Sequence, residues 1–397
     1  MSFTHGVYKS EVATSIIAPV TGESGLPVVV GTSVKGPVND PVLVYTYEEA
    51  IETFGASDDW DTYTLNEFIY SHFALYGQAP AVLISVGQTG SANAIIGGYD
   101  GASGKYTGLE LVNYVYPKFR LIPGMILAPT WSQVAEVAAV MKAKAESVSG
   151  VFSCVALVDI PCIPNGAYAY SAVSQWKTSK NLTDKRMIVC WPCVKLGDKV
   201  YHLSTQLAGV MARTDHERGD VPYKSPSNEL LQCEACTDML GNEIPLTLEE
   251  ANYLNSQGVV TALNWTGGWR VWGNRTGAYP ASTDVKDVFI PVRRMYDYIG
   301  NMFITTFWQE ADQPMTARLV RQIVNSFNMY MNSLQAREMI LGGRVEFKVN
   351  ENALTDITNG ILRFHVYFTP PVPAETIEGI FEYDPEYLQV LFEAVRG

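Results

Sequence analysis

Short apolar runs alternate with amphipathic segments through the first half of the chain, and this alternation constrains the fold more than any other feature. The runs 26–34, 79–87, 120–129, 151–161 and 186–194 each have the length and composition of a buried strand. Segments with a helical period lie between several of them. Strands and helices that alternate at this spacing predict a mostly parallel α/β sheet with helices on both faces.

The intervening segments have recognisable helical signals. Residues 47–55 and 64–77 each end at a glycine, and residues 166–179 are compatible with a helix. The longest helix predicted in this half covers 130–148, where Thr130 and Gln133 fit a capping-box pattern.

Two further local predictions concern this half of the chain. A stripe of apolar residues should form the buried face of the 130–148 helix. We expect the glycine-rich segment 90–108 to be a loop.

The second half changes to long helices followed by short strands. Residues 291–311 and 315–341 predict two helices, and the second carries a one-sided apolar stripe. The members of that stripe are Val320, Val324, Phe327, Met331 and Leu334. Residues 343–351, 361–369 and 376–384 then predict three strands.

The change of pattern near 279–287 marks a domain boundary. We therefore predict an α/β core domain (three-layer, mostly parallel sheet) over 26–283 and a C-terminal α+β domain over 284–374. Residues 1–25 and 375–397 are predicted to be extended N- and C-terminal arms.

Composition excludes several classes of protein. The chain has 397 residues, of which 47% are apolar and 17% charged, so it can form a large core. Its net charge of -13 argues against a nucleic-acid-binding protein, which needs an excess of Lys and Arg. We also expect neither a secretory signal nor a direct contact with membranes, since no signal pattern or long apolar run is present.

Two C-x-x-C pairs, Cys190/Cys193 and Cys233/Cys236, leave three interpretations open. They are buried structural thiols, a metal site, or a thiol redox centre. The pairs lie further apart than in most zinc sites, and Cys190 lies in an apolar run, which favours buried thiols. A thiol- or metal-dependent α/β enzyme that uses these four cysteines is the alternative function.

The cluster "RTDHERGD" (213–220) brings His216 together with several carboxylates. Such a cluster can bind a metal or transfer protons, but so many charged residues in succession are more typical of a solvated surface loop. The common nucleotide-binding and hydrolase motifs are missing from the sequence, so we predict no catalytic, cofactor-binding or metal-binding residues.

Several long blocks, in order along the chain, carry a family resemblance. They are "HGVYKSEV", "GQAPAVLISVG", "GVMARTDHERGDVPYKSPSN", "GVVTALNWTGGWRVWGNRTG" and "RFHVYFTPPVPAETIEGIFEYDPEYLQVLF". In this combination the sequence resembles contractile tail sheath proteins, which surround the tubes of myophage tails and of phage-tail-like bacteriocins.

The resemblance implies a structural subunit and not an enzyme. It implies an α/β core likened to subtilisin-type sheets without their catalytic triad, and stacked hexameric rings around an inner tube. Contraction would be a change of helical packing, without nucleotide hydrolysis and without a cofactor. The implied partners are further copies of the chain, the tail tube protein, and baseplate and tail terminator proteins. The implied location is a virion or tail-like particle assembled in the host bacterial cytoplasm.

The resemblance also implies that each arm adds a strand to the C-terminal domain of a neighbouring subunit, as exposed strand edges permit. The predicted interface residues are Val7, Tyr8, Glu11, Ile377, Ile380, Phe381, Tyr383 and Tyr387. The alternative, in which both ends pack on their own subunit, stays open. Arg318 and Arg321 form a candidate basic patch facing the tube.

Overall fold

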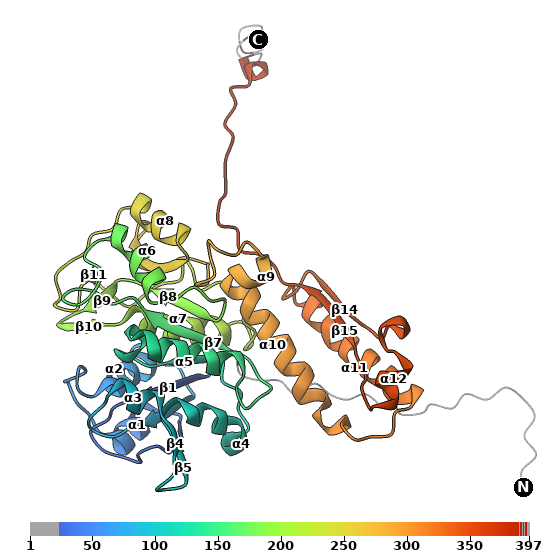
Figure 1. Ribbon diagram of the computed structural model, residues 1–397. Coiled ribbons are helices and arrows are strands. Elements are labelled where there is room, and N and C mark those ends of the chain that lie inside the picture. The colour runs from blue at the N-terminus through green and yellow to red at the C-terminus, as the bar shows by residue number, and fades with distance from the viewer. Residues whose placement is uncertain (1–23, 389, 391, 393, 395–397) are drawn as a thin grey trace, which may run out of the picture.

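The computed structural model of the protein describes residues 24–388, 390, 392 and 394. Its largest element is an eight-stranded sheet (Figure 1). In spatial order the strands are β13 (Trp269–Trp272), β12 (Val259–Asn264), β8 (Met187–Cys190), β7 (Val155–Asp159), β6 (Met125–Leu127), β1 (Pro27–Gly31), β3 (Ala81–Ser85) and β2 (Val42–Val44). The six central strands are parallel, and each edge strand is antiparallel to its neighbour. The predicted, mostly parallel α/β sheet is confirmed.

Helices cover both faces of this sheet because its central strands are apolar on both sides. In β1, Val28 and Val30 pack into one hydrophobic cluster and Val29 packs into the other. The first face is covered by α3 (Ala92–Ile96), η2 (Gly108–Tyr114), α4 (Val115–Phe119), α5 (Ala135–Glu146), α6 (Tyr170–Ser179) and α8 (Leu248–Ser256). The second is covered by α1 (Tyr47–Phe54), α2 (Thr64–Ile69), η1 (Tyr70–Leu75) and α7 (Leu203–His216).

The loop predicted over 90–108 was wrong in part. This segment contains the short helix α3 and a hairpin of β4 (Gly98–Asp100) and β5 (Lys105–Thr107). The Ser91 side chain starts α3 by accepting a hydrogen bond from the Ala94 N–H at 3.2 Å. Gly97 ends the helix with a φ of 70°, a conformation that glycine adopts without strain.

The capping box predicted at Thr130 was also wrong. Residues Trp131–Gln133 form a separate short turn (η3), and α5 begins only at Ala135, after Val134. The turn allows the Ser132 hydroxyl to reach a buried carboxylate on β7, and this tertiary contact overrides the local cap. The predicted apolar stripe does form the buried face of the helix. Its buried members are Val137, Ala138, Met141 and Ala145.

The strand predicted over 186–194 is two strands in two sheets. β8 ends at Cys190, a cis Trp191–Pro192 peptide follows, and β9 (Cys193–Leu196) begins. β9 lies between β10 (Lys199–Tyr201) and β11 (Ala235–Thr237) in a small antiparallel sheet.

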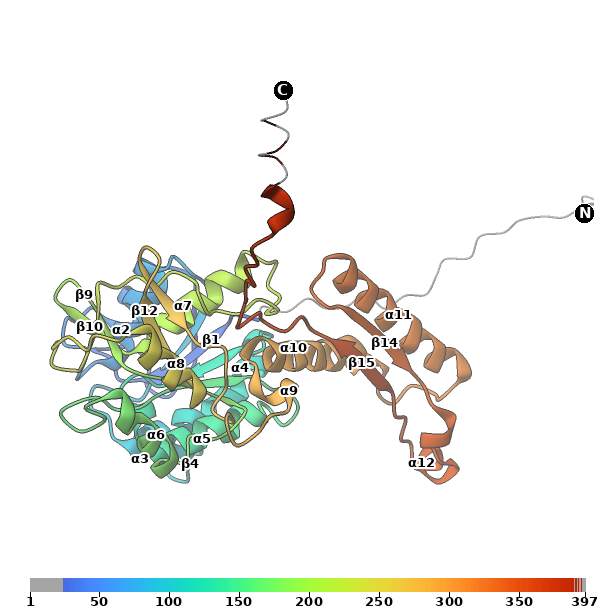
Figure 2. The same ribbon diagram turned by 90° about the horizontal axis from the view of Figure 1, so that it is seen from above.

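The remaining elements lie beside this core and surround a hydrophobic cluster of their own, here called the C-terminal cluster (Figure 2). They are α9 (Val285–Val288), α10 (Ile290–Phe307), η4 (Trp308–Glu310), α11 (Ala317–Ala336), β14 (Gly342–Glu346), η5 (Val349–Glu351), α12 (Leu354–Thr358) and β15 (His365–Thr369). Phe327 and Met331 of α11 are fully buried in the cluster, whereas the predicted stripe members Val320 and Val324 are only half-buried. Among the described helices, none is long and apolar enough to cross a membrane.

The third strand predicted after α11 was wrong for this single chain. Residues 376–384 have no regular secondary structure, and a short turn, η6 (Pro385–Leu388), follows. After β15 the chain returns to the core beside α9 and then extends away from the body (Figures 1 and 2). A strand needs a hydrogen-bonding partner, and these residues pair with no strand in the part of the chain that the structure describes.

Candidate functional site

The C-terminal arm exposes large apolar side chains to an unusual extent. Phe381 is 98% exposed and Ile377 is 89% exposed. Ile380, Tyr383 and Tyr387, the other described residues predicted to lie at an interface, are also exposed. Folded chains seldom leave contiguous large apolar groups uncovered unless these groups contact a partner. The predicted residues Val7, Tyr8 and Glu11 lie outside the described residues.

A second exposed feature is the two-stranded sheet formed by β14 and β15. Its two edges differ. The Asn328 side chain of α11 accepts a hydrogen bond from the Val345 N–H (2.8 Å) and donates one to the Val345 carbonyl oxygen (3.1 Å). These backbone groups therefore point away from β15, and α11 closes the edge of β14 at this residue.

The edge of β15 differs, because β14 is the only strand that pairs with it in the described part of the chain. Val366 lies opposite Val345 in the register, so its backbone groups point to the outer side of the sheet. The outer edge of β15 is therefore the edge at which a further strand can add.

Arg318 and Arg321 lie on the exposed side of α11. This helix contains no Asp or Glu, although the chain as a whole has 41 acidic and 28 basic residues. The exposed side of α11 is therefore locally basic on an acidic protein.

Buried ion pairs join α10 to the α/β core, and sequence reasoning missed them. Asp215 was predicted to belong to a solvated loop, and this was wrong, because it lies in the last turn of α7 and is 1% exposed. Both of its carboxylate oxygens accept hydrogen bonds from the Arg294 guanidinium of α10, and Arg294 Nη1 lies 3.0 Å from Asp215 Oδ1. Arg294 also donates to the Ser24 carbonyl at 3.2 Å.

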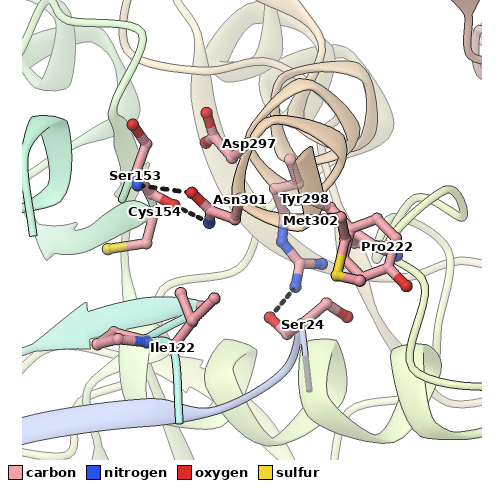
Figure 3. Close-up of a pocket in the computed structure, with 12 residues that line it drawn as sticks. Ser24, Ile122, Ser153, Cys154, Pro222, Asp297, Tyr298, Asn301 and Met302 are labelled. Atoms are coloured by element: carbon pink, nitrogen blue, oxygen red, sulfur yellow. Dashed lines mark hydrogen bonds between the residues drawn. The ribbon is translucent and has the colours of Figure 1, made fainter. Parts of the chain in front are cut away.

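A second group of buried contacts lies further along α10. Asp297 accepts hydrogen bonds from Arg293 (2.9 Å) and from Arg186 at the start of β8. Asn301 pairs with the backbone of Ser153 through both its amide oxygen and nitrogen, at 3.0 and 2.8 Å (Figure 3). These contacts surround a cavity of only about 40 Å³, so the junction between α10 and the core is closely packed.

The cysteine pairs behave as buried thiols. All six cysteines are free; Cys190, Cys193 and Cys236 are buried and Cys233 is half-buried. Burial raises the pKa of the Cys190 and Cys236 thiols, which keeps them protonated and unreactive. Within the described ranges, no group of three or more His, Cys, Asp or Glu side chains could hold a metal ion.

A buried polar cluster lies at the carboxyl edge of the large sheet, where α/β folds commonly bind ligands. Asp159, at the end of β7, accepts hydrogen bonds from the Ser204 hydroxyl (2.5 Å) and the Ser132 hydroxyl (3.1 Å). Nearby, His202 Nδ1 lies 2.8 Å from a Glu67 carboxylate oxygen. All five of these side chains are at most 3% exposed.

The adjoining crevice between the carboxyl ends of β1 and β6 is filled by the protein itself. A Cβ atom at Gly90 would lie 2.5 Å from the Trp131 ring and 2.7 Å from the Thr32 methyl group. The polar cluster therefore has a structural role inside the core. Burial lowers the pKa of His202, but the Glu67 carboxylate, and to a lesser extent Asp159, outweigh this effect and raise that pKa to about 9.

Comparison with known proteins agrees with the resemblance of the sequence. A prophage major tail sheath protein of Pseudomonas aeruginosa is 27% identical over 399 residues, which cover 94% of this chain and 95% of that protein. The tail sheath protein of Burkholderia phage BcepMu is 28% identical over 315 residues, 76% of this chain and 63% of the phage protein. The chain thus spans less than two thirds of the phage protein. No family model matches the chain.

Solved structures agree at the level of the fold. The sheath complex of an extracellular contractile injection system (PVC) in its contracted state has a TM-score of 0.73 at 17% identity, over 98% of this chain and 99% of the other. The chain is similar to contractile tail sheath proteins over most of its length, and its fold is that of a contractile sheath subunit. In agreement with these relatives, the chain is a structural protein and not an enzyme, and the four cysteines of the C-x-x-C pairs lie in or against its core.

We expect the stability of this sheath protein to fall as the pH rises from about 6.5 to about 9. Between these values the folded protein keeps a proton on His202 that the unfolded chain has lost. The loss of unfolding free energy should be on the order of 3 kcal/mol. Urea unfolding of the monomer at several pH values measures it. A side-chain NMR titration, with the resonance assigned through His202→Gln, should have its midpoint near 9 and not near 6.5.

We expect Asp215→Asn to destabilise the fold by about 3–5 kcal/mol, because it leaves the Arg294 guanidinium buried without its counter-ion. Thermal and urea unfolding measure the effect. The matched control is Asp220→Asn, whose side chain is 46% exposed, and which should change stability by less than about 0.5 kcal/mol. Equal stability of the two variants would show that the junction does not depend on this ion pair.

Proposed function

We propose that this protein polymerises as stacked hexameric rings around an inner tube and contracts by helical repacking, which drives the tube through a cell envelope. Support comes from the names of its relatives, which are tail sheath proteins of phages and prophages. Support also comes from its likeness in fold to the sheath of a contractile injection system. The observation that carries the proposal is the exposed apolar C-terminal arm.

The arm has the properties of a strand that is completed by another subunit. Its residues 376–384 are extended, without secondary structure, and include Ile377, Ile380 and Phe381, each at least 80% exposed. We propose that they add to the free edge of β15 in a neighbouring copy. Main-chain hydrogen bonds would supply affinity, and burial of the apolar side chains would stabilise the assembly.

The proposed division into domains follows from the same idea. It keeps a core over 26–283, a C-terminal domain over 284–374, and arms over 1–25 and 375–397. Backbone pairing between the arms and neighbouring subunits can survive rotation of the subunits if the chain flexes between the arm and the body. Tube, baseplate and tail terminator proteins are the further proposed partners, in a virion or tail-like particle assembled in the host bacterial cytoplasm.

The exposed side of α11 is the proposed contact with the tube. Arg318 and Arg321 lie three residues apart, on one side of a helix that has no acidic residue. A tube with an acidic surface would be attracted to this side, and the attraction would act mainly on recognition and rate.

Removal of residues 376–397 should leave a folded, soluble monomer that forms no tubes, because the added strand is lost. Removal of residues 1–20 should have the same result. Electron microscopy measures assembly, and circular dichroism measures folding. The untruncated protein should form tubes or polysheaths, and tubes of normal length from both truncations would contradict the proposal.

A finer variant separates the apolar contacts from the length of the arm. Ile380→Ser with Phe381→Ser should reduce assembly at least about tenfold, since two large apolar side chains no longer become buried. The matched control is Glu378→Ser with Glu382→Ser, which changes the same arm but should leave assembly close to normal.

Reversal of both arginines, Arg318→Glu with Arg321→Glu, should weaken co-assembly with the tube protein by about tenfold at low salt and less at high salt. Self-assembly of the sheath without the tube should be unchanged. Co-sedimentation of sheath and tube proteins measures the effect. Equal co-assembly of the variant and the unaltered protein would remove α11 as the contact.

A further inference from the structure

Arg275 lies where three distant parts of the chain meet. It follows β13 in the core and forms an isolated antiparallel bridge with Phe289, the residue that caps α10. Its guanidinium donates two hydrogen bonds to the Glu375 carboxylate, from Nε at 3.1 Å and from Nη2 at 2.5 Å. Glu375 is the first residue of the C-terminal arm.

The setting of this pair distinguishes it from an ordinary surface ion pair. The guanidinium carbon lies 4.0 Å from the centre of the Tyr279 ring and 5.0 Å from that of Phe289. The side chains of Arg275 and Glu375 are only 23% and 29% exposed. The rings hold the planar guanidinium in place, so the two parallel hydrogen bonds fix both the position and the direction of the carboxylate.

The loop that carries Arg275 is itself tightly held. The Thr276 N–H donates to the Val288 carbonyl at 2.8 Å, and its hydroxyl donates to the Asp287 carbonyl at 2.6 Å. On the other side, Lys177 Nζ of α6 donates to the Tyr279 carbonyl at 2.6 Å. Arg275 therefore projects from a rigid support that joins the core to the start of α10.

The chain before Glu375 is less exposed to solvent than the chain after it. In the preceding spacer Pro370 is buried and Pro371 and Pro373 are half-buried, although Val372, Ala374 and Glu375 itself are exposed. From Thr376 onward every residue up to Leu388 is exposed. Glu375 is thus the last point at which the described arm is anchored to its own subunit.

We infer that Arg275 positions the C-terminal arm: its ion pair with Glu375 sets the direction in which the arm leaves the subunit. The inference rests on the proposed function, because direction matters only if the arm reaches a neighbouring copy. It places the flexing point of the arm after Glu375. The proline-containing spacer that precedes Glu375 stays with the body.

The test measures the direction of the arm in the monomer. Spin labels on unnatural amino acids at Ile377, two residues beyond Glu375, and at Tyr253 on α8, both exposed, report one distance distribution by pulsed electron resonance. In otherwise unaltered protein the distribution should be narrow. Glu375→Gln should broaden it roughly twofold, because the flexible part of the chain then begins further back. Arg275→Lys should broaden it as well, since lysine keeps the charge but loses the planar fork and the stacking.

Two controls make the result specific. Glu382→Gln removes an exposed carboxylate from the same arm and should leave the distribution narrow. Glu375→Asp keeps the charge and should give an intermediate width. The unfolding temperature should be the same in all variants. A lower unfolding temperature would indicate a general loss of structure and not a local change at the arm. Unchanged widths in Glu375→Gln and Arg275→Lys would overturn the inference.

The outcome is independent of the proposed function. The distance measurement uses monomer, at a concentration where sedimentation detects no polymer, and is valid whether or not the arm mediates assembly. If the arm truncation still forms tubes, the proposed function fails even where Glu375→Gln broadens the distribution. If the truncation abolishes assembly and the distribution does not broaden, only the role of Arg275 fails.

Discussion

Helix α10 is the element on which the rest of the arrangement depends, because it belongs to two hydrophobic cores. Met295 and Ile299 pack into the C-terminal cluster, and Ile290 packs against the core sheet. The helix also buries Arg293 and Arg294, which would be costly without counter-ions. Asp215 and Asp297 supply these negative charges. Because a buried ion pair needs short and well-aligned hydrogen bonds, these pairs fix the angle between the core and the C-terminal part.

This rigid junction gives the C-terminal arm a defined starting point. The start of α10, at Phe289, touches Arg275, and Arg275 holds the root of the C-terminal arm. Strand β15 packs against the C-terminal cluster, to which the same helix contributes (Figure 2), and its outer edge is unpaired among the described strands. The exposed arm and the outer edge of β15 are therefore carried by one body, as the proposed assembly requires of each subunit.

The core is an α/β fold with its usual ligand site closed. Gly90, Trp131 and Thr32 fill the crevice at the carboxyl edge, and the Asp159 and Glu67 carboxylates beside it bond with neighbouring side chains of the core. A fold that hosts catalysis in other proteins serves here as a rigid body, which agrees with the rule that function resides in sites and not in folds.

Local pattern alone determined the parallel sheet, the helices on its two faces and the long helices α10 and α11, because burial on one or two sides imposes a period on the sequence. Several ordered blocks also pointed to the sheath family. Tertiary contacts decided the rest. Asp215 became a buried residue because its partner Arg294 lies 79 positions away, and Thr130 lost its cap because Ser132 bonds Asp159. Residues 376–384 have the composition of a strand, but a strand forms only where another one offers its edge, and a single chain does not offer it to them.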